Sequence, residues 1–100
     1  MGNQFGEKIK QLREANSLLQ KDIASKVSID TPMLSKIERG ERRAKKEQIS
    51  VFAELLGAND GELMTLWLAD QLIKIVANET YALQAMRIAE KEVKMITKAI

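Results

Sequence analysis

The stretch QKDIASKVSIDTPMLSKIERG, residues 20–40, decides how this sequence is expected to fold. Apolar residues recur in it at helical spacing up to Val27 and again from Leu34, and polar residues break the pattern in between. The stretch therefore predicts two short helices joined by a tight turn. Asp30 or Thr31 can cap the second helix, the proline falls in its first turn, where a missing N–H costs little, and the final glycine ends it.

The two predicted helices have an apolar inner face and a polar outer face. Ala24 is small where the helices must cross closely. Larger apolar side chains bury the inner faces and fix the crossing: Ile23, Val27, Leu34 and Ile37. The outer face of the second helix is then left free. A helix of this diameter fits the major groove of DNA, where residues near its N-terminus reach the base edges.

Further helices are predicted on both sides of this stretch. Phe5, Ile9 and Leu12 recur at helical spacing in a first helix that ends near Asn16. A fourth helix has its apolar stripe between residues 49 and 56 and is closed by a glycine. These segments add amphipathic faces that can bury the inner side of the two central helices.

The C-terminal segment predicts two more helices. Asn59, followed three residues later by a glutamate, resembles a capping box that opens a fifth helix. Apolar residues go most of the way round this helix over residues 62–76, so it must be covered on more than one side. Asn78 is the predicted cap of a last helix that runs to the terminus. Its apolar residues are spaced as a heptad seam: Ala82, Met86, Ala89, Val93, Ile96 and Ile100.

Composition places the chain among small helical proteins. With 100 residues, 45% of them hydrophobic, one proline and five glycines, we expect a single all-α domain. The absence of Cys and His removes disulfides, imidazole bases and the usual zinc ligands, so we expect no enzyme, metal or cofactor. No apolar run is long enough for a signal peptide or a membrane span, and we expect a cytoplasmic protein without a membrane partner.

Basic residues gather immediately after the central stretch. Residues 36–46 contain six basic and two acidic side chains, whereas the net charge of the whole chain is only +2. Residues 61–100 hold five basic and five acidic residues, so the C-terminal part is neutral. The two parts are therefore expected to have different roles, with phosphate contacts confined to the first.

Four segments together resemble the lambda-repressor-like, or Xre-type, helix-turn-helix family over residues 5–63. They are the central stretch, FGEKIKQLR at 5–13, IERGER at 37–42 and FAELLG at 52–57. The resemblance implies a five-helix DNA-binding domain at residues 1–63, with an added C-terminal helix in a continuous extension, residues 64–100, that serves dimerisation. It also implies an interior pair between Arg13 and Glu38.

The geometry and the resemblance together assign candidate contacts to double-stranded DNA. The candidate base-reading residues are Thr31, Pro32, Ser35, Lys36 and Arg39. Lys36 is the best candidate for reading guanine, since it can donate to the O6 and N7 acceptors. The candidate phosphate contacts, which set register, are Gln20, Arg42, Arg43, Lys45 and Lys46.

Three positions depart from the family pattern. Leu19 stands where Ser or Thr usually caps the first motif helix, so that cap is missing unless Ser17 shifts to serve. Ser28 stands where the turn usually has glycine, so a residue with a side chain is expected at positive φ, at a cost of about 1 kcal/mol. Lys45 replaces a common capping serine and adds a positive charge that attracts phosphate.

The expected function is a homodimeric transcriptional regulator, more specifically a repressor, that binds a palindromic operator; no small-molecule ligand is evident. The heptad seam packs either within one copy or across a two-fold axis, and the second arrangement is preferred because one recognition helix supplies few contacts. The expected interface residues are Trp67, Leu72, Met86, Ala89, Val93 and Ile96. The competing hypothesis is an antitoxin or adaptor that binds a partner protein through its C-terminal helices. A hydrolytic enzyme ranks last, because no spacing pairs the carboxylates for acid–base catalysis.

Overall fold

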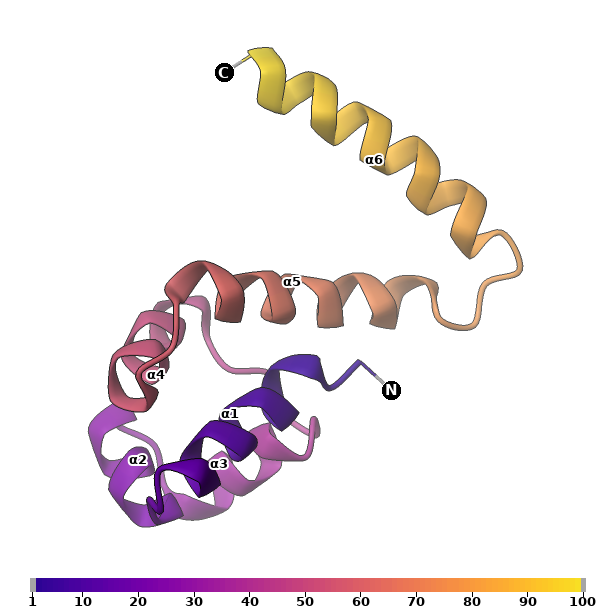
Figure 1. Ribbon diagram of the computed structural model, residues 1–100. Coiled ribbons are helices and arrows are strands. Elements are labelled where there is room, and N and C mark those ends of the chain that lie inside the picture. Colours follow the sequence, from indigo (N-terminus) through magenta and orange to yellow (C-terminus); the bar gives the residue numbers. More distant parts are fainter. Residues whose placement is uncertain (1, 100) are drawn as a thin grey trace.

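The computed structural model describes residues 2–99, and over that range the chain forms α-helices and no strand. The helices are α1 (Gln4–Ala15), α2 (Gln20–Val27), α3 (Thr31–Glu38), α4 (Ile49–Leu56), α5 (Asp60–Val76) and α6 (Ala82–Ala99), with a 3₁₀ turn, η1 (Lys46–Gln48), before α4. The expected all-α class is confirmed. Figure 1 shows that α1 to α5 form one packed body, from which α6 projects on the side opposite α3.

The hydrophobic core lies among the first five helices. Its largest fully buried side chains come from α1, α3, α4 and α5: Phe52, Ile9, Leu34, Ile49 and Leu63. The rings of Phe5 and Phe52 meet edge to face, with their centroids 5.8 Å apart. The apolar stripes predicted from the sequence therefore converge on one core that supports α3 from behind.

Helix α1 crosses the C-terminal end of α3 at very short range. A Cβ atom on Gly6 would lie 2.3 Å from the carbonyl oxygen of Ile37, so no side chain fits at this position. Beside it, the Asn3 side-chain amide donates a hydrogen bond of 3.1 Å to the carbonyl oxygen of Glu38. Close backbone contact thus fixes where α3 ends relative to α1.

The helix ends agree with most of the sequence predictions. The Asp30 carboxylate accepts from the Met33 N–H at 2.8 Å at the start of α3, and Asn59 accepts from the Glu62 N–H at 3.0 Å at the start of α5. Gly40 has a positive φ of 77° just after α3. Helix α2 begins after Leu19 without a side-chain cap, as the sequence predicts.

The predicted start of the last helix is wrong. Asn78 does not cap α6, which begins at Ala82. The chain turns after α5 instead, where the Glu79 N–H donates to the carbonyl oxygen of Val76, and a second turn brings the Ala82 N–H to the carbonyl oxygen of Glu79. These two turns use the residues that the sequence pattern assigns to the first turn of the helix.

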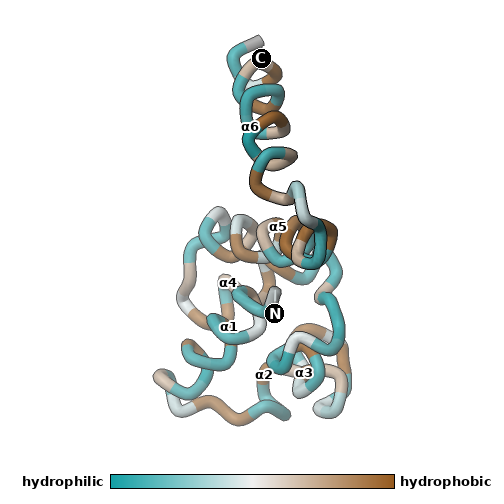
Figure 2. Tube along the Cα trace, turned by 90° about the vertical axis from the view of Figure 1, so that its right-hand side faces the viewer, coloured by the Kyte–Doolittle hydropathy of each residue, from teal (hydrophilic) through white to brown (hydrophobic). Residues whose placement is uncertain are grey.

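Helix α6 leaves its apolar side uncovered in a single copy of the chain. The side chains of residues 83–98 are all exposed, and apolar segments alternate with polar ones along the helix in Figure 2. The adjoining half of α5 exposes Leu68, Leu72 and Ile75. The expectation that α5 is covered on more than one side is therefore not met within one copy. Among residues 2–99, no helix has both the length and the apolarity needed to cross a membrane.

The turn between α2 and α3 contains the strained residue that the sequence predicts. Ser28 adopts a left-handed conformation with φ of 63° and ψ of 42°. This conformation lets the Ile29 N–H donate to the carbonyl oxygen of Ala24 at 3.0 Å, which closes the end of α2. The turn that sets the angle between α2 and α3 thus requires a conformation that glycine adopts at lower cost.

Replacing Ser28 by glycine should stabilise the protein. We expect Ser28→Gly to raise the free energy of unfolding by up to about 1 kcal/mol, because glycine adopts positive φ without steric strain. Urea denaturation followed by circular dichroism measures the change. The matched control is Ser25→Gly on the exposed side of α2, which should lower stability by roughly 0.5–1 kcal/mol. Equal destabilisation by both substitutions would contradict the assignment of strain to Ser28.

Candidate nucleic-acid interface

Helix α3 buries one side and exposes the other. Leu34, Ile37 and Glu38 are buried against the body of the protein. Of the candidate base-reading residues, Thr31, Pro32, Lys36 and Arg39 are exposed and Ser35 is half-buried. The polar outer side of α3 predicted from the sequence is therefore open to solvent.

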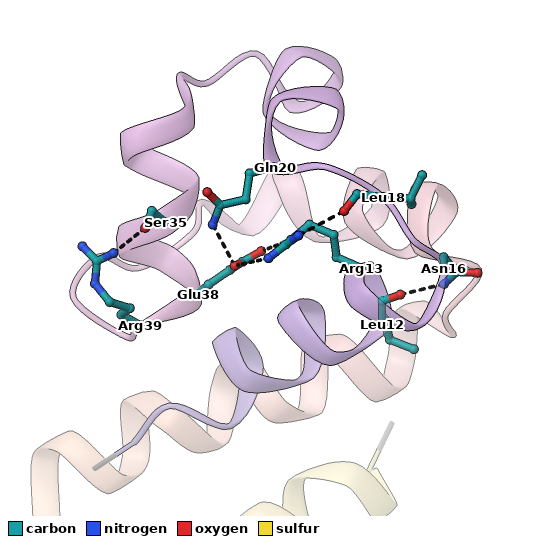
Figure 3. Close-up of polar contacts among 8 residues, drawn as sticks. All are labelled: Leu12, Arg13, Asn16, Leu18, Gln20, Ser35, Glu38 and Arg39. Atoms are coloured by element: carbon teal, nitrogen blue, oxygen red, sulfur yellow. Dashed lines mark hydrogen bonds and ion pairs between the residues drawn. The ribbon is translucent and has the colours of Figure 1, made fainter.

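A buried ion pair holds the C-terminal end of α3. Glu38 accepts two hydrogen bonds from the Arg13 guanidinium, from Nε at 2.7 Å and from Nη2 at 3.0 Å, in the forked geometry drawn in Figure 3. Arg13 also donates to the carbonyl oxygen of Leu18 at 3.0 Å. The hydrogen bonds to Glu38 raise the pKa of Arg13 above its usual range. The Arg13–Glu38 pair implied by the family resemblance is present.

Gln20 joins the same network. Its side-chain amide donates to Glu38 Oε1 at 3.0 Å, so this predicted phosphate contact turns its amide nitrogen toward the protein interior. The backbone N–H groups in the first turn of α2 have no side-chain cap at Leu19. Uncapped N–H groups of this kind are suited to a phosphate oxygen. Gln20 thus links the interior pair to the start of α2.

Two of the candidate base-reading residues are bonded to each other. The Arg39 guanidinium donates to the half-buried Ser35 hydroxyl and to the exposed Glu41 carboxylate. The hydrogen bond and the opposite charge raise the pKa of Arg39 and lower the pKa of Glu41. Arg39 and Ser35 must release these bonds before either side chain can reach a base.

The segment after α3, residues 42–46, is called the basic loop here. Its cations Arg42, Arg43, Lys45 and Lys46 are exposed, whereas Ala44 between them is buried. An open hollow of about 270 Å³ is lined by residues of this loop together with residues of the α2–α3 turn and of α3, Met33 among them. The basic loop therefore lies next to the side of α3.

The sequence comparison agrees with this arrangement. A family profile described as a helix-turn-helix domain matches residues 4–67, which is more than half of the chain. The chain belongs to the helix-turn-helix family. Searches of curated proteins and of solved structures found no significant match. The match covers α1 to α4, including the pair α2 and α3 joined by a tight turn, and extends into α5 as far as Trp67.

The residues predicted to form a dimer interface fall in two different places. Trp67 is half-buried within the helix-turn-helix domain, and its indole Nε1 donates to the carbonyl oxygen of Ala44 at 2.8 Å. The other predicted residues lie on the uncovered sides of α5 and α6. Four of them line an open groove of about 400 Å³ between the two helices: Leu72, Met86, Ala89 and Val93. Ile96 is exposed one turn further along α6.

Sequence reasoning missed the polar residues of α5 that tie the helix-turn-helix domain together. The buried Asp70 carboxylate accepts the backbone N–H groups of Gln4 at 2.7 Å and Phe5 at 2.9 Å, and so caps α1 from a distant part of the chain. Gln71 accepts a hydrogen bond from Arg43 at 2.8 Å. The available signal was the presence of these two polar residues within the otherwise apolar stretch 66–73 of that helix.

Proposed function

We propose that this helix-turn-helix protein is a sequence-specific transcriptional regulator of the lambda-repressor-like, or Xre, type. It binds a palindromic operator as a homodimer and acts as a repressor. The observation that supports this most strongly is the polar side of α3, exposed on a buried scaffold beside the basic loop. A protein bound across two successive major grooves excludes other proteins from that DNA, so occupancy alone is enough for repression.

In the proposed complex, the N-terminal half of α3 enters the major groove. Lys36 donates to guanine O6 or N7. Thr31 contacts a thymine methyl group or forms a hydrogen bond, and Pro32 offers an apolar contact. Ser35 and Arg39 contribute after exchanging their mutual hydrogen bond for contacts to the DNA. The exposure of these side chains supports this assignment, since none of the five needs the domain to unfold before it reaches a base.

Phosphate contacts are proposed for Gln20 at the start of α2 and for the cations of the basic loop. Arg42, Lys45 and Lys46 are exposed, and the first two line the hollow beside α3, where they can flank the groove that α3 enters. Such contacts hold the register of the protein on the duplex without reading sequence, and they make affinity depend on salt. Arg43 lies in the same loop, but its guanidinium is bonded to Gln71 on α5.

The homodimer is proposed to form through α6 and the adjoining half of α5. Of the seam residues, Met86, Ala89, Val93 and Ile96 are exposed in one copy, and the first three line the groove together with Leu72. Ile100, the last residue of the predicted seam, lies outside the described residues. If the same apolar surface of a second copy packed against this one, both apolar surfaces would be removed from water. A two-fold dimer allows this, because it brings the same surface of each copy together. Two recognition helices about 34 Å apart would then reach successive major grooves.

A second candidate function is favoured by the same uncovered surface. An antitoxin or adaptor would use the apolar side of α6 to bind a different protein and would contact DNA only secondarily. The oligomeric state of the pure protein discriminates between the two functions. A stable homodimer supports the regulator, whereas a monomer that retains its exposed apolar surface supports the adaptor.

Substituting Lys36 should change sequence preference. We expect Lys36→Ala to reduce discrimination at one base pair of the operator by roughly 1–3 kcal/mol, because the amine no longer donates to guanine. The matched variant Arg42→Ala should weaken binding to operator and random DNA alike and reduce the salt slope by about 1. Fluorescence anisotropy with both DNAs at several salt concentrations measures these effects. If Lys36→Ala lost affinity equally on both DNAs, Lys36 would not be a base-reading residue.

Charging the seam of α6 should dissociate the dimer. Val93→Asp places a carboxylate at the proposed interface, where burial without a partner is costly, so we expect sedimentation equilibrium to show a monomer. Lys91→Asp changes the charge more strongly, but Lys91 lies on the side of α6 away from the seam, so this variant should leave the dimer intact. A Val93→Asp protein that sediments like the unmodified dimer would rule out this seam as the interface.

A further inference from the structure

Trp67 and its neighbours on α5 make contacts that the proposed DNA readout leaves unused. We propose that Trp67 is a positioning residue for DNA binding, which acts by holding the basic loop in place for phosphate contact. The inference rests on the proposed function, because it assigns a role to the loop that binds phosphate. Trp67 itself does not touch DNA in this proposal.

The first support is the hydrogen bond at the centre of the loop. The indole Nε1 of Trp67 donates to the carbonyl oxygen of Ala44 at 2.8 Å, and the Ala44 side chain is 2% exposed. Ala44 is thus fixed both by its buried methyl group and by its carbonyl oxygen. The exposed residues Arg43 and Lys45 flank it directly, so the position of Ala44 sets where their backbones lie.

The second support is that Arg43 is held against α5. Its guanidinium carbon lies 5.8 Å from the centre of the Trp67 ring, and its Nη1 donates to Gln71 at 2.8 Å. Arg43 therefore acts as a brace between the loop and α5, while Arg42 and Lys45 carry the charge that is free to meet phosphate. This assignment revises the direct phosphate contact predicted for Arg43 from the sequence.

The third support is the local attachment of the rest of the loop. At its start, the N–H groups of Glu41 and Arg42 donate to the carbonyl oxygen of Lys36. At its end, the Lys45 N–H donates to the Gln48 side chain at 2.9 Å. The bond from Trp67 joins the backbone at the middle of the loop to a different helix, next to the side-chain bond from Arg43 to Gln71. Without it, the loop must be ordered when DNA binds, and that ordering reduces affinity.

The test compares two variants of α5 in the full-length protein. Trp67→Phe keeps an aromatic ring beside Arg43 but removes the N–H donor. The matched control is Thr65→Val, which also removes one side-chain hydrogen bond to a backbone carbonyl on α5, that of Gly61, at an exposed site away from the loop. The probe is a random-sequence DNA duplex, since phosphate contacts dominate non-specific binding. Affinity is measured at several salt concentrations, and amide hydrogen exchange reports on the loop.

We expect Trp67→Phe to weaken binding to this duplex by about three- to tenfold, the effect of one hydrogen bond, and to lower the salt slope. Exchange of the Lys45 and Lys46 amides should become faster, while α3 keeps its protection. Thr65→Val should change none of these. Gln71→Ala, which removes the acceptor for Arg43, should act in the same direction with a smaller effect, and it serves as the test if Trp67→Phe does not fold.

Two results overturn the inference. The first is a folded Trp67→Phe protein with unchanged affinity and salt slope. The second is faster exchange throughout the domain, which would show a general loss of stability. A failure of the unmodified protein to bind any duplex overturns the proposed function itself. That result is distinct, because it appears before either variant is compared.

Discussion

The buried carboxylate of Glu38 is the interaction on which the presentation of α3 depends. It accepts hydrogen bonds from Arg13 on α1 and Gln20 on α2, so one side chain at the end of α3 joins three helices. With eight residues, α3 is too short to be stable alone, and its direction comes from what it is attached to. Removing one partner of a buried pair typically costs about 3–5 kcal/mol, because the other charge stays buried. The polar side of α3 faces outward because this network and the core hold the opposite side.

Helix α5 connects the helix-turn-helix domain to the proposed interface. One side of it carries Trp67, Asp70 and Gln71, which hold the basic loop and the first turn of α1. The other side exposes Leu68, Leu72 and Ile75 beside the groove shared with α6. A second copy that packed against the exposed side would contact α5, a helix that the domain already holds at several points. The geometry of the proposed dimer and the geometry of the basic loop would therefore both depend on α5.

The sequence was most informative where structure depends on neighbours in the chain. The cap at Asp30, the turn conformation at Ser28 and the stop at Gly40 all follow from local chemistry and are confirmed. The apolar spacing likewise predicts which side of α3 is buried. The start of α6 was predicted wrongly, because a capping residue at Asn78 has the right type but two turns intervene before Ala82.

Contacts between distant residues could not be predicted in this way. Asp70 caps α1 across more than half of the chain, and Trp67 bonds the basic loop through a single N–H. Neither contact has a sequence spacing that specifies it, because both depend on how α5 crosses the domain. The contact of Arg43 could not be predicted either. The sequence makes Arg43 a candidate phosphate contact, but in the structure its guanidinium lies over the Trp67 ring.

Selection of bound sequences from random duplex DNA tests the central claim most directly. If α3 reads the major groove from a two-fold dimer, the recovered DNA should contain a palindromic motif with half-site centres about 10 base pairs apart. Recovery of DNA without any common motif, or of a motif without two-fold symmetry, would contradict the account.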